Sequence, residues 1–308
     1  MKKSVYEIVT EKFIDAVQSA LDKGENLTWE KGFKSNWIAP MNAKTKREYH
    51  GSNVLLLSTL NNIKGYNSNL FLTFKQIKEM KGKINKGAKS LPVTFWKWFI
   101  DDRNIELTLD KLKENPLKKR ASIYYYNVFA VEDTDIDIDR LKVEANNNNN
   151  IKLETPESII SGYENAPEIK TLDALKCACY IPEKDAIHTP PLSQYDNSAL
   201  YYKTLFHEMT HSTGHGKRLN RNLTGSKKGA AYSKEELVAE MGSAMLAHRA
   251  GLDVDKANQN TTAYLISWLQ VLKENPKYLI SAGTQAEKAA RFILGTYEEY
   301  KQEIKQGA

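Results

Sequence analysis

Apolar residues in the first twenty positions recur at the spacing of one helix face. They are Val5, Ile8, Val9, Phe13 and Val17, and this period predicts an amphipathic helix over residues 4–21. Further along, runs rich in β-branched and aromatic residues predict strands at 70–74, 91–100 and 121–131. Thr73 can cap a helix over 74–80, and the wholly apolar segment 54–57 is typical of a buried helix or strand.

The second half of the chain mixes short strands with longer helices. The patterns predict strands over 177–181 and 185–188, and helices over 156–163, 197–211, 260–272 and 284–305. Ser233 is followed three residues later by Glu236, which fits a capping box, so a further helix should begin at Ser233.

Residues 132–155 differ in character from both flanking regions. An acidic run is followed by a tract of asparagines at 146–150, and such segments have little to pack. We therefore expect an α+β protein of two domains, joined by a linker over 134–155. The first, 1–133, should be α+β, and the second, 156–308, should be mostly helical with a small sheet.

Charge divides the chain in the same way. Residues 1–130 hold 23 Lys and Arg against 13 Asp and Glu, a net charge of +10, whereas residues 131–308 hold 21 against 25, a net charge of −4. No apolar run is long enough for a membrane helix, and the charged N-terminus lacks the apolar core of a signal peptide. The two cysteines form a C-x-C pair too small for a disulfide framework. These features predict a cytoplasmic protein without a membrane partner.

The basic front region combines cationic side chains with aromatic rings, which are the two components of a single-strand nucleic-acid surface. Many of its basic residues lie in turns rich in Gly and Asn, where binding residues concentrate. An alternative is that the aromatic residues form the core and the lysines a solvated face. We predict DNA contacts for Trp37, Asn42, Lys44, Lys46, Arg47, Tyr49, Asn53, Lys75, Lys86, Lys89 and Trp96.

The predicted helix 197–211 contains the motif H-E-x-x-H, formed by His207, Glu208 and His211. Residues four apart lie on one helix face, so both imidazoles can bind one Zn²⁺. Glu208 is then placed to act as the general base toward a water that the metal activates. The motif fixes only three positions, so a third ligand is needed to support it.

Carboxylates in the following helix can supply that ligand. Glu236 and Glu240 share a helix face, and the pair resembles the gluzincin metallopeptidases, in which a downstream Glu binds zinc and an acidic residue four positions later orients the first His. The resemblance implies Glu236 as ligand and Glu240 as its outer partner, with Glu240 and Glu235 as alternative ligands. The metzincin pattern fails, because its third His would fall at Lys217. We expect His215 near the site, outside the ligand set.

Several segments together resemble the ArdC-type antirestriction proteins. In the front region these are Asn42–Leu57, Leu70–Ile77, Lys86–Ser90 and Tyr125–Phe129, and in the rear Asp185–Pro190, Tyr201–His215, Arg218–Arg221 and Glu235–Leu246. The resemblance implies a single-stranded-DNA-binding domain before a zincin-like metallopeptidase domain, with a role in protecting incoming DNA from restriction. We expect a monomer with one Zn²⁺ per chain, bound to single-stranded DNA and acting on a host protein. The alternative is a DNA-binding shield whose metal is structural.

Overall fold

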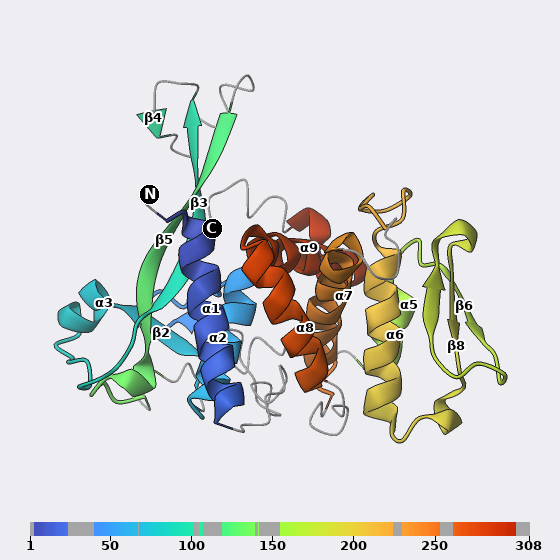
Figure 1. The fold of residues 1–308 in the computed structure, drawn as a ribbon, viewed down its shortest axis with the longest axis horizontal. Helices are drawn as coiled ribbons and strands as arrows, with labels where there is room; N and C mark the ends of the chain where they lie inside the picture. Colours follow the sequence, from blue (N-terminus) through green and yellow to red (C-terminus); the bar gives the residue numbers. More distant parts are fainter. Residues whose placement is uncertain are drawn as a thin grey trace.

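The computed structural model describes residues 3–23, 40–66, 68–100, 105–106, 119–138, 141, 155–223, 230–252 and 261–299 (Figure 1). Its helices are α1 (Val5–Asp22), α2 (Ser52–Ile63), α3 (Phe74–Glu79), α5 (Pro156–Gly162), α6 (Ser198–Ser212), α7 (Ala230–Arg249), α8 (Thr261–Glu274) and α9 (Lys277–Ile293). Its strands are β1 (Met41–Asn42), β2 (Leu70–Thr73), β3 (Leu91–Ile100), β4 (Ile105–Glu106), β5 (Lys119–Ala130), β6 (Glu168–Thr171), β7 (Cys179–Ile181) and β8 (Ala186–Thr189).

A five-stranded sheet in the order β1-β2-β5-β3-β4 forms the front half, residues 3–141. Successive side chains of a strand point to opposite faces, and β2 shows this directly. Phe71 joins the core that contains α1 and α2, whereas Leu70 and Leu72 join a smaller core with Ile77 of α3. Beyond these cores, β3 and β5 continue as a ribbon that projects from the sheet, and β4 pairs with the outer end of β3 (Figure 1).

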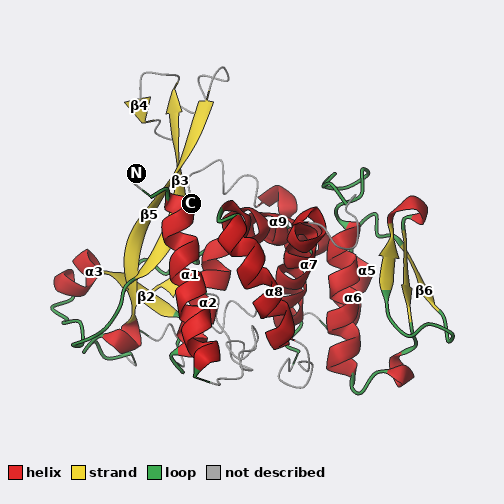
Figure 2. Ribbon diagram, viewed as in Figure 1, coloured by secondary structure: helices red, strands yellow, loops and turns green. Residues whose placement is uncertain are grey.

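The front half and the rear half, residues 155–299, share one hydrophobic core. Phe13 and Val17 of α1 belong to the same buried cluster as Leu237 of α7, Trp268 of α8 and Leu279 of α9. Figure 2 shows these helices stacked side by side between the two sheets. Burial of apolar area is the main favourable term in folding, so the two halves stabilise each other.

A second core holds the rear half together. The three-stranded sheet β6-β8-β7 lies against α6, and Ile187 of β8 packs with Leu205, Phe206 and Met209 of that helix. On its other side α6 packs against α7, so α6 is held between a sheet and a helix (Figure 2). The apolar side chains Leu205, Phe206 and Met209 of α6 are buried in this core, whereas His207 and His211 remain partly exposed.

The α+β class and most predicted elements are confirmed. Residues 54–57 form part of helix α2, and Thr73 caps α3 with the reciprocal bonds of a capping box. The bounds of two helices were predicted wrongly. Helix α7 begins at Ala230 rather than at Ser233. Helix α9 begins at Lys277 and ends at Ile293, because Gly295 adopts a left-handed φ of 70° that stops the helix.

The proposed division of the chain at 134–155 stays a prediction. Residues 139–140 and 142–154 of that segment lie outside the described residues, and Leu141 is buried in the small core beside α3. In the described part of the chain, none of the helices combines the length and the apolar character required to cross a bilayer.

Candidate metal centre

Helix α6 presents the H-E-x-x-H motif because its two ends and its apolar face are fixed. Asn197 caps its first turn by accepting a hydrogen bond from the amide of Leu200 at 2.9 Å. The apolar face of the helix is fully buried in the rear core. His207 and His211 lie one turn apart on the other side, where each imidazole is only partly exposed.

Close packing brings α7 against this side of α6. A methyl group at Gly242 would lie 2.5 Å from Cγ2 of Thr210, so only glycine permits the two backbones to approach this far. Thr210 is itself fully buried. This contact sets the separation at which Glu236, earlier on α7, faces the two histidines.

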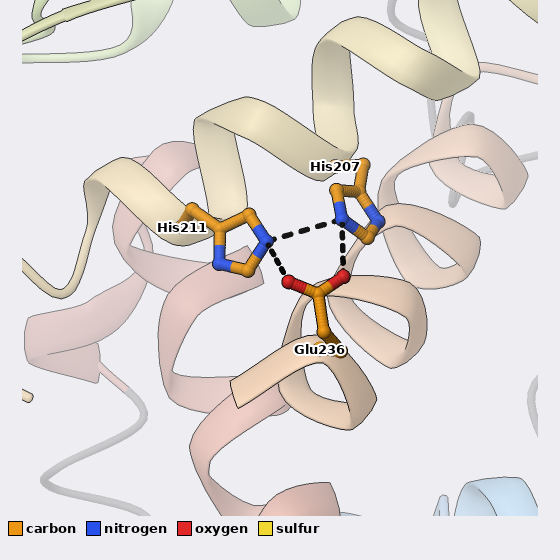
Figure 3. A group of neighbouring side chains, drawn as sticks. All are labelled: His207, His211 and Glu236. Carbon is orange, nitrogen blue, oxygen red and sulfur yellow. Dashed lines mark hydrogen bonds and ion pairs between the residues drawn. The ribbon is translucent and has the colours of Figure 1, made fainter. Parts of the chain in front are cut away.

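Three side chains converge at this crossing (Figure 3). The Nε2 atoms of His207 and His211 lie 3.1 Å apart, and the Glu236 oxygens lie 3.4 Å and 3.3 Å from them. Four ligands at 2.0–2.1 Å from a zinc ion stand roughly 3.3 Å from one another in a tetrahedron. The three residues therefore fit a divalent cation, with a fourth position open, and within the described residues they are the one group suited to a metal.

Each histidine also meets a second carboxylate at its outer nitrogen. Nδ1 of His207 lies 3.5 Å from Glu240, and Nδ1 of His211 lies 3.4 Å from Glu235. Burial disfavours a charged His211, but hydrogen bonds to Glu235 and Glu236 outweigh burial and raise the pKa of its imidazole to about 10. A bound cation at Nε2 has to displace that proton.

Glu208 of α6 contacts the small sheet. Its carboxylate accepts a hydrogen bond from the backbone amide of Tyr180 at 2.7 Å. Tyr180 is in β7, which pairs with β8 and forms one edge of the small sheet in the described part of the chain. Glu208 thus bridges the histidine-bearing helix and a sheet edge.

His215 belongs to a neighbouring cluster. Its Nδ1 lies 3.7 Å from Asp185 and accepts a hydrogen bond from the amide of Lys217. Arg218 pairs with the same Asp185 and donates to the hydroxyl of Tyr180. The cluster fastens β7 to the turn after α6, and His215 is not in the group of three ligands.

The structure places the predicted DNA-contacting residues in three different settings. Asn42, Tyr49 and Asn53 are buried and make internal contacts. Trp37 lies outside the described residues. The exposed members are Lys44, Lys46, Arg47, Lys75, Lys86, Lys89 and Trp96. Three of these lysines have protein partners. Lys44 and Lys75 both pair with Glu79, and Lys46 donates to the carbonyl of Leu141.

An exposed aromatic cluster lies on the projecting ribbon, and the sequence reasoning missed it. Phe95 stacks against Tyr124 and Tyr126 with ring centroids 5.8 Å and 5.6 Å apart, and Lys97 lies 5.5 Å above the Tyr124 ring. We call these four residues the aromatic face. Trp96 and Tyr125 point to the opposite side of the ribbon. Alternation along 91–100 and 121–131 was the signal that could have separated the two sides.

Two family descriptions match successive parts of the chain. Residues 3–131 match the N-terminal domain of anti-restriction factor ArdC, and residues 164–285 match a zincin-like metallopeptidase. Two Escherichia coli DNA primases named TraC are 28% and 29% identical over 98% of this chain. The chain spans only 28% and 20% of their lengths. The protein y4eC of Sinorhizobium fredii is 24% identical over 99% of this chain and 96% of its own length.

Crystal structures of the antirestriction protein ArdC from the R388 plasmid have a similar fold. The Mn(II)-bound structure has a TM-score of 0.69 at 28% identity and covers 97% of this chain and 100% of that one. The metal-free structure has a TM-score of 0.67, also at 28% identity, and covers 96% and 99%. Both domains and the group of metal-binding residues thus occur in one chain and in the expected order. The chain therefore belongs to the ArdC type of antirestriction protein, with an ArdC N-terminal domain followed by a zincin-like metallopeptidase domain.

Proposed function

We propose that this protein counters restriction by binding single-stranded DNA through its front half and by hydrolysing a host protein at one zinc ion in its rear half. The observation that carries the enzymatic part is the convergence of His207, His211 and Glu236 at distances that suit one cation. A structure of the ArdC relative contains Mn(II), which supports the binding of a divalent ion by this chain. Two imidazoles and one carboxylate form a typical catalytic zinc set.

The surrounding residues have distinct roles in this proposal. A cation held by the three ligands would act as a Lewis acid toward a peptide carbonyl and make water more acidic. Glu208 accepts the proton of the attacking water and returns it to the leaving amine. The outer edge of β7, beside Glu208, takes an extended peptide as an added strand.

Glu208→Gln tests the assigned base. The variant should bind as much zinc as the wild type, because Glu208 is not one of the three ligands, and it should no longer cleave protein. Zinc content is measured by mass spectrometry, and cleavage is measured on casein and on host extract in the presence of single-stranded DNA. A variant that cuts as fast as the wild type would show that Glu208 is not the base.

The aromatic face is the surface that best fits a single strand. Tyr124 and Tyr126 are 39% and 37% exposed, so their rings are open to bases, and Lys97 supplies a cation beside them. Stacking of a base on such a ring contributes about 1–3 kcal/mol. Trp96 lies with Tyr125 on the other side of the ribbon, is 47% exposed and marks the alternative surface for the strand.

Tyr124→Ala should weaken binding of an oligo-dT strand by the loss of one stacking contact, roughly 5–150-fold. Lys97→Ala should make the plot of log affinity against log salt concentration less steep, by the amount expected for the loss of about one phosphate contact. Tyr125→Ala, on the opposite side of the ribbon, is the matched control. Fluorescence anisotropy measures all three variants. Equal losses for Tyr124→Ala and Tyr125→Ala would exclude the aromatic face as the specific surface.

A DNA-binding shield is the second candidate function. The metal-free ArdC structure resembles this chain almost as well as the Mn(II)-bound one, with TM-scores of 0.67 and 0.69. The fold therefore does not depend on the ion in that relative, which leaves room for a DNA-binding role without hydrolysis. Plasmid transfer into a restricting host separates the proteolytic function from the shield. Glu208→Gln should abolish protection of the plasmid DNA if proteolysis is required, and should leave it intact if the protein acts only as a shield.

A further inference from the structure

Glu235 contacts His211 at Nδ1, the ring nitrogen that faces away from the other two ligands, and both side chains are largely buried. Oε1 of Glu235 lies 3.4 Å from Nδ1 of His211, and the two side chains are 12% and 13% exposed. The other ring nitrogen, Nε2, faces Glu236 at 3.3 Å. The ring of His211 is therefore contacted by a carboxylate at each nitrogen.

Glu235 is in turn fixed by a two-point contact with Arg221. Nη2 of Arg221 donates to Oε1 of Glu235 at 2.6 Å, and its Nε donates to Oε2 at 3.2 Å. The same guanidinium donates to Oγ1 of Thr213 at 2.6 Å and to the carbonyl of Thr210 at 2.8 Å. Both threonines lie at the end of α6 that bears His211. Arg221 thus locks a carboxylate of α7 to the helix that carries the imidazole.

The first histidine has a looser outer partner. Glu240 lies 3.5 Å from Nδ1 of His207 and is 21% exposed, and no cation contacts Glu240 among the residues that the structure describes. Arg221, by comparison, is only 7% exposed and is committed to Glu235. A fork-shaped guanidinium contact restricts a carboxylate much more than a single contact does.

We propose that Glu235, held by Arg221, is a positioning residue that orients His211 for metal binding. By accepting a hydrogen bond from Nδ1–H, Glu235 keeps the lone pair of Nε2 directed at the cation and makes the imidazole a stronger ligand. The proposal rests on the metal site proposed above. Its competitor is an ion pair that only joins α6 to α7, without influence on the metal.

Metal affinity separates these two roles. The dissociation constants for Zn²⁺ and Mn²⁺, each measured alone by competition with a chromophoric chelator, should rise about 10–100-fold in Glu235→Ala. Glu235→Gln should fall between this variant and the wild type, because its amide oxygen still accepts a hydrogen bond. Arg221→Lys should also weaken binding, since lysine lacks the fork. Glu240→Gln is the matched control and should lose less affinity than Glu235→Gln.

A spectroscopic measurement gives an independent readout. In ¹⁵N-labelled, zinc-loaded protein, the Nδ1–H proton of His211 should resonate downfield and exchange slowly with water because Glu235 accepts its hydrogen bond, and both features should weaken in Glu235→Gln. The melting temperature of the metal-free variants reports on folding alone. Glu235→Ala leaves buried Arg221 without its carboxylate partner and could fail to fold for that reason. In that case, Glu235→Gln and Arg221→Lys test the proposal.

The outcomes distinguish the two proposals. Lower melting temperatures with unchanged metal affinity in Glu235→Gln and Arg221→Lys would overturn the positioning role and leave the metal site standing. Failure of the wild-type chain to bind either metal would overturn the site itself, and the positioning role with it. A graded loss of affinity with little change in metal-free stability would support the proposal.

Discussion

At the scale of single residues, Asn53 shows how a polar side chain can replace a missing strand. Its amide nitrogen donates to the carbonyl of Thr94 at 2.8 Å, and its oxygen accepts from the Thr94 amide at 2.8 Å. Thr94 lies in β3, where β5 occupies only one edge. Asn53 thus satisfies two backbone groups that would otherwise be buried without partners.

Asn53→Ala is therefore expected to destabilise the fold by about 1–3 kcal/mol, the cost of leaving buried polar groups unsatisfied. Denaturant unfolding measures the change. Lys86→Ala, at an exposed position, is the control and should leave the free energy of unfolding unchanged. If Asn53→Ala lowered DNA affinity at full stability, the side chain would serve the nucleic acid directly.

Residue chemistry was easier to predict than residue setting. His207 and Glu208 could be singled out because the spacing of their motif puts them on defined faces of one helix, whereas Glu236 was chosen from the resemblance to gluzincins. The burial of Asn42 and Tyr49 could not be predicted, because it depends on contacts with α3 and β2, which are distant in sequence. The clamp of Arg221 on Glu235 also joins a turn to a later helix, and no local pattern reports such a contact.

At the scale of elements, the crossing of α6 and α7 sets the geometry of the metal group. Gly242→Ala should push the helices apart, because Thr210 is buried and its hydroxyl is bonded to the carbonyl of Phe206. Overpacking should lower the free energy of unfolding by about 1–3 kcal/mol. The better helix propensity of alanine should offset about 1 kcal/mol of that loss. Metal affinity should fall as well.

Thermal unfolding and chelator competition measure these two effects of Gly242→Ala. Gly162→Ala is the matched control, since a methyl group there meets nothing within 4 Å. Unchanged metal affinity in a destabilised Gly242→Ala protein would show that the crossing does not set the spacing of the ligands.

The start of α2 and the middle of α9 are joined by a second ionic contact. Buried Glu287 accepts from the amide of Gly51 and lies 3.2 Å from Nδ1 of His50. Burial opposes both charges, but their mutual hydrogen bond outweighs it, raising the pKa of His50 and lowering the pKa of Glu287. Arg291 also pairs with Glu287 and holds His50 back from a larger increase.

The sign of the pH dependence follows from these directions. The contribution of His50 is complete below its ordinary pKa of 6.5 and declines as pH rises through the raised value. The contribution of Glu287 is complete above its ordinary pKa of 4.5 and declines as pH falls through the lowered value. Melting temperatures from pH 5 to pH 9 should show the wild type losing its advantage over His50→Gln as pH rises. A difference that is constant over this range would contradict the assignment.

At the scale of the whole molecule, the shared core predicts that the two halves unfold together. Calorimetry should show one transition, with equal calorimetric and van't Hoff enthalpies. Gly283→Ala should lower its midpoint, because the added methyl would lie 2.6 Å from Cα of Ser52 across the junction. Two separable transitions would mean that the junction contributes little to stability.

The sequence reasoning favoured two modules because composition changes sharply near residue 132. The composition of a segment shows how much apolar surface it can bury, but it does not show which distant helix will cover that surface. The apolar stripe of α1 was correctly predicted, whereas its packing in one core with α8 and α9 depends on long-range contacts. The class of the fold was therefore predictable, and the joining of its halves was not.

The common core also fixes how far the ribbon stands from the histidines. If single-stranded DNA lies along the ribbon, as proposed above, a protein bound farther along that DNA would reach the metal group only at a fixed distance from the ribbon. Cleavage of such a protein would require a minimum number of nucleotides between the two contact points, and shorter strands would bind without exposing their cargo to the metal.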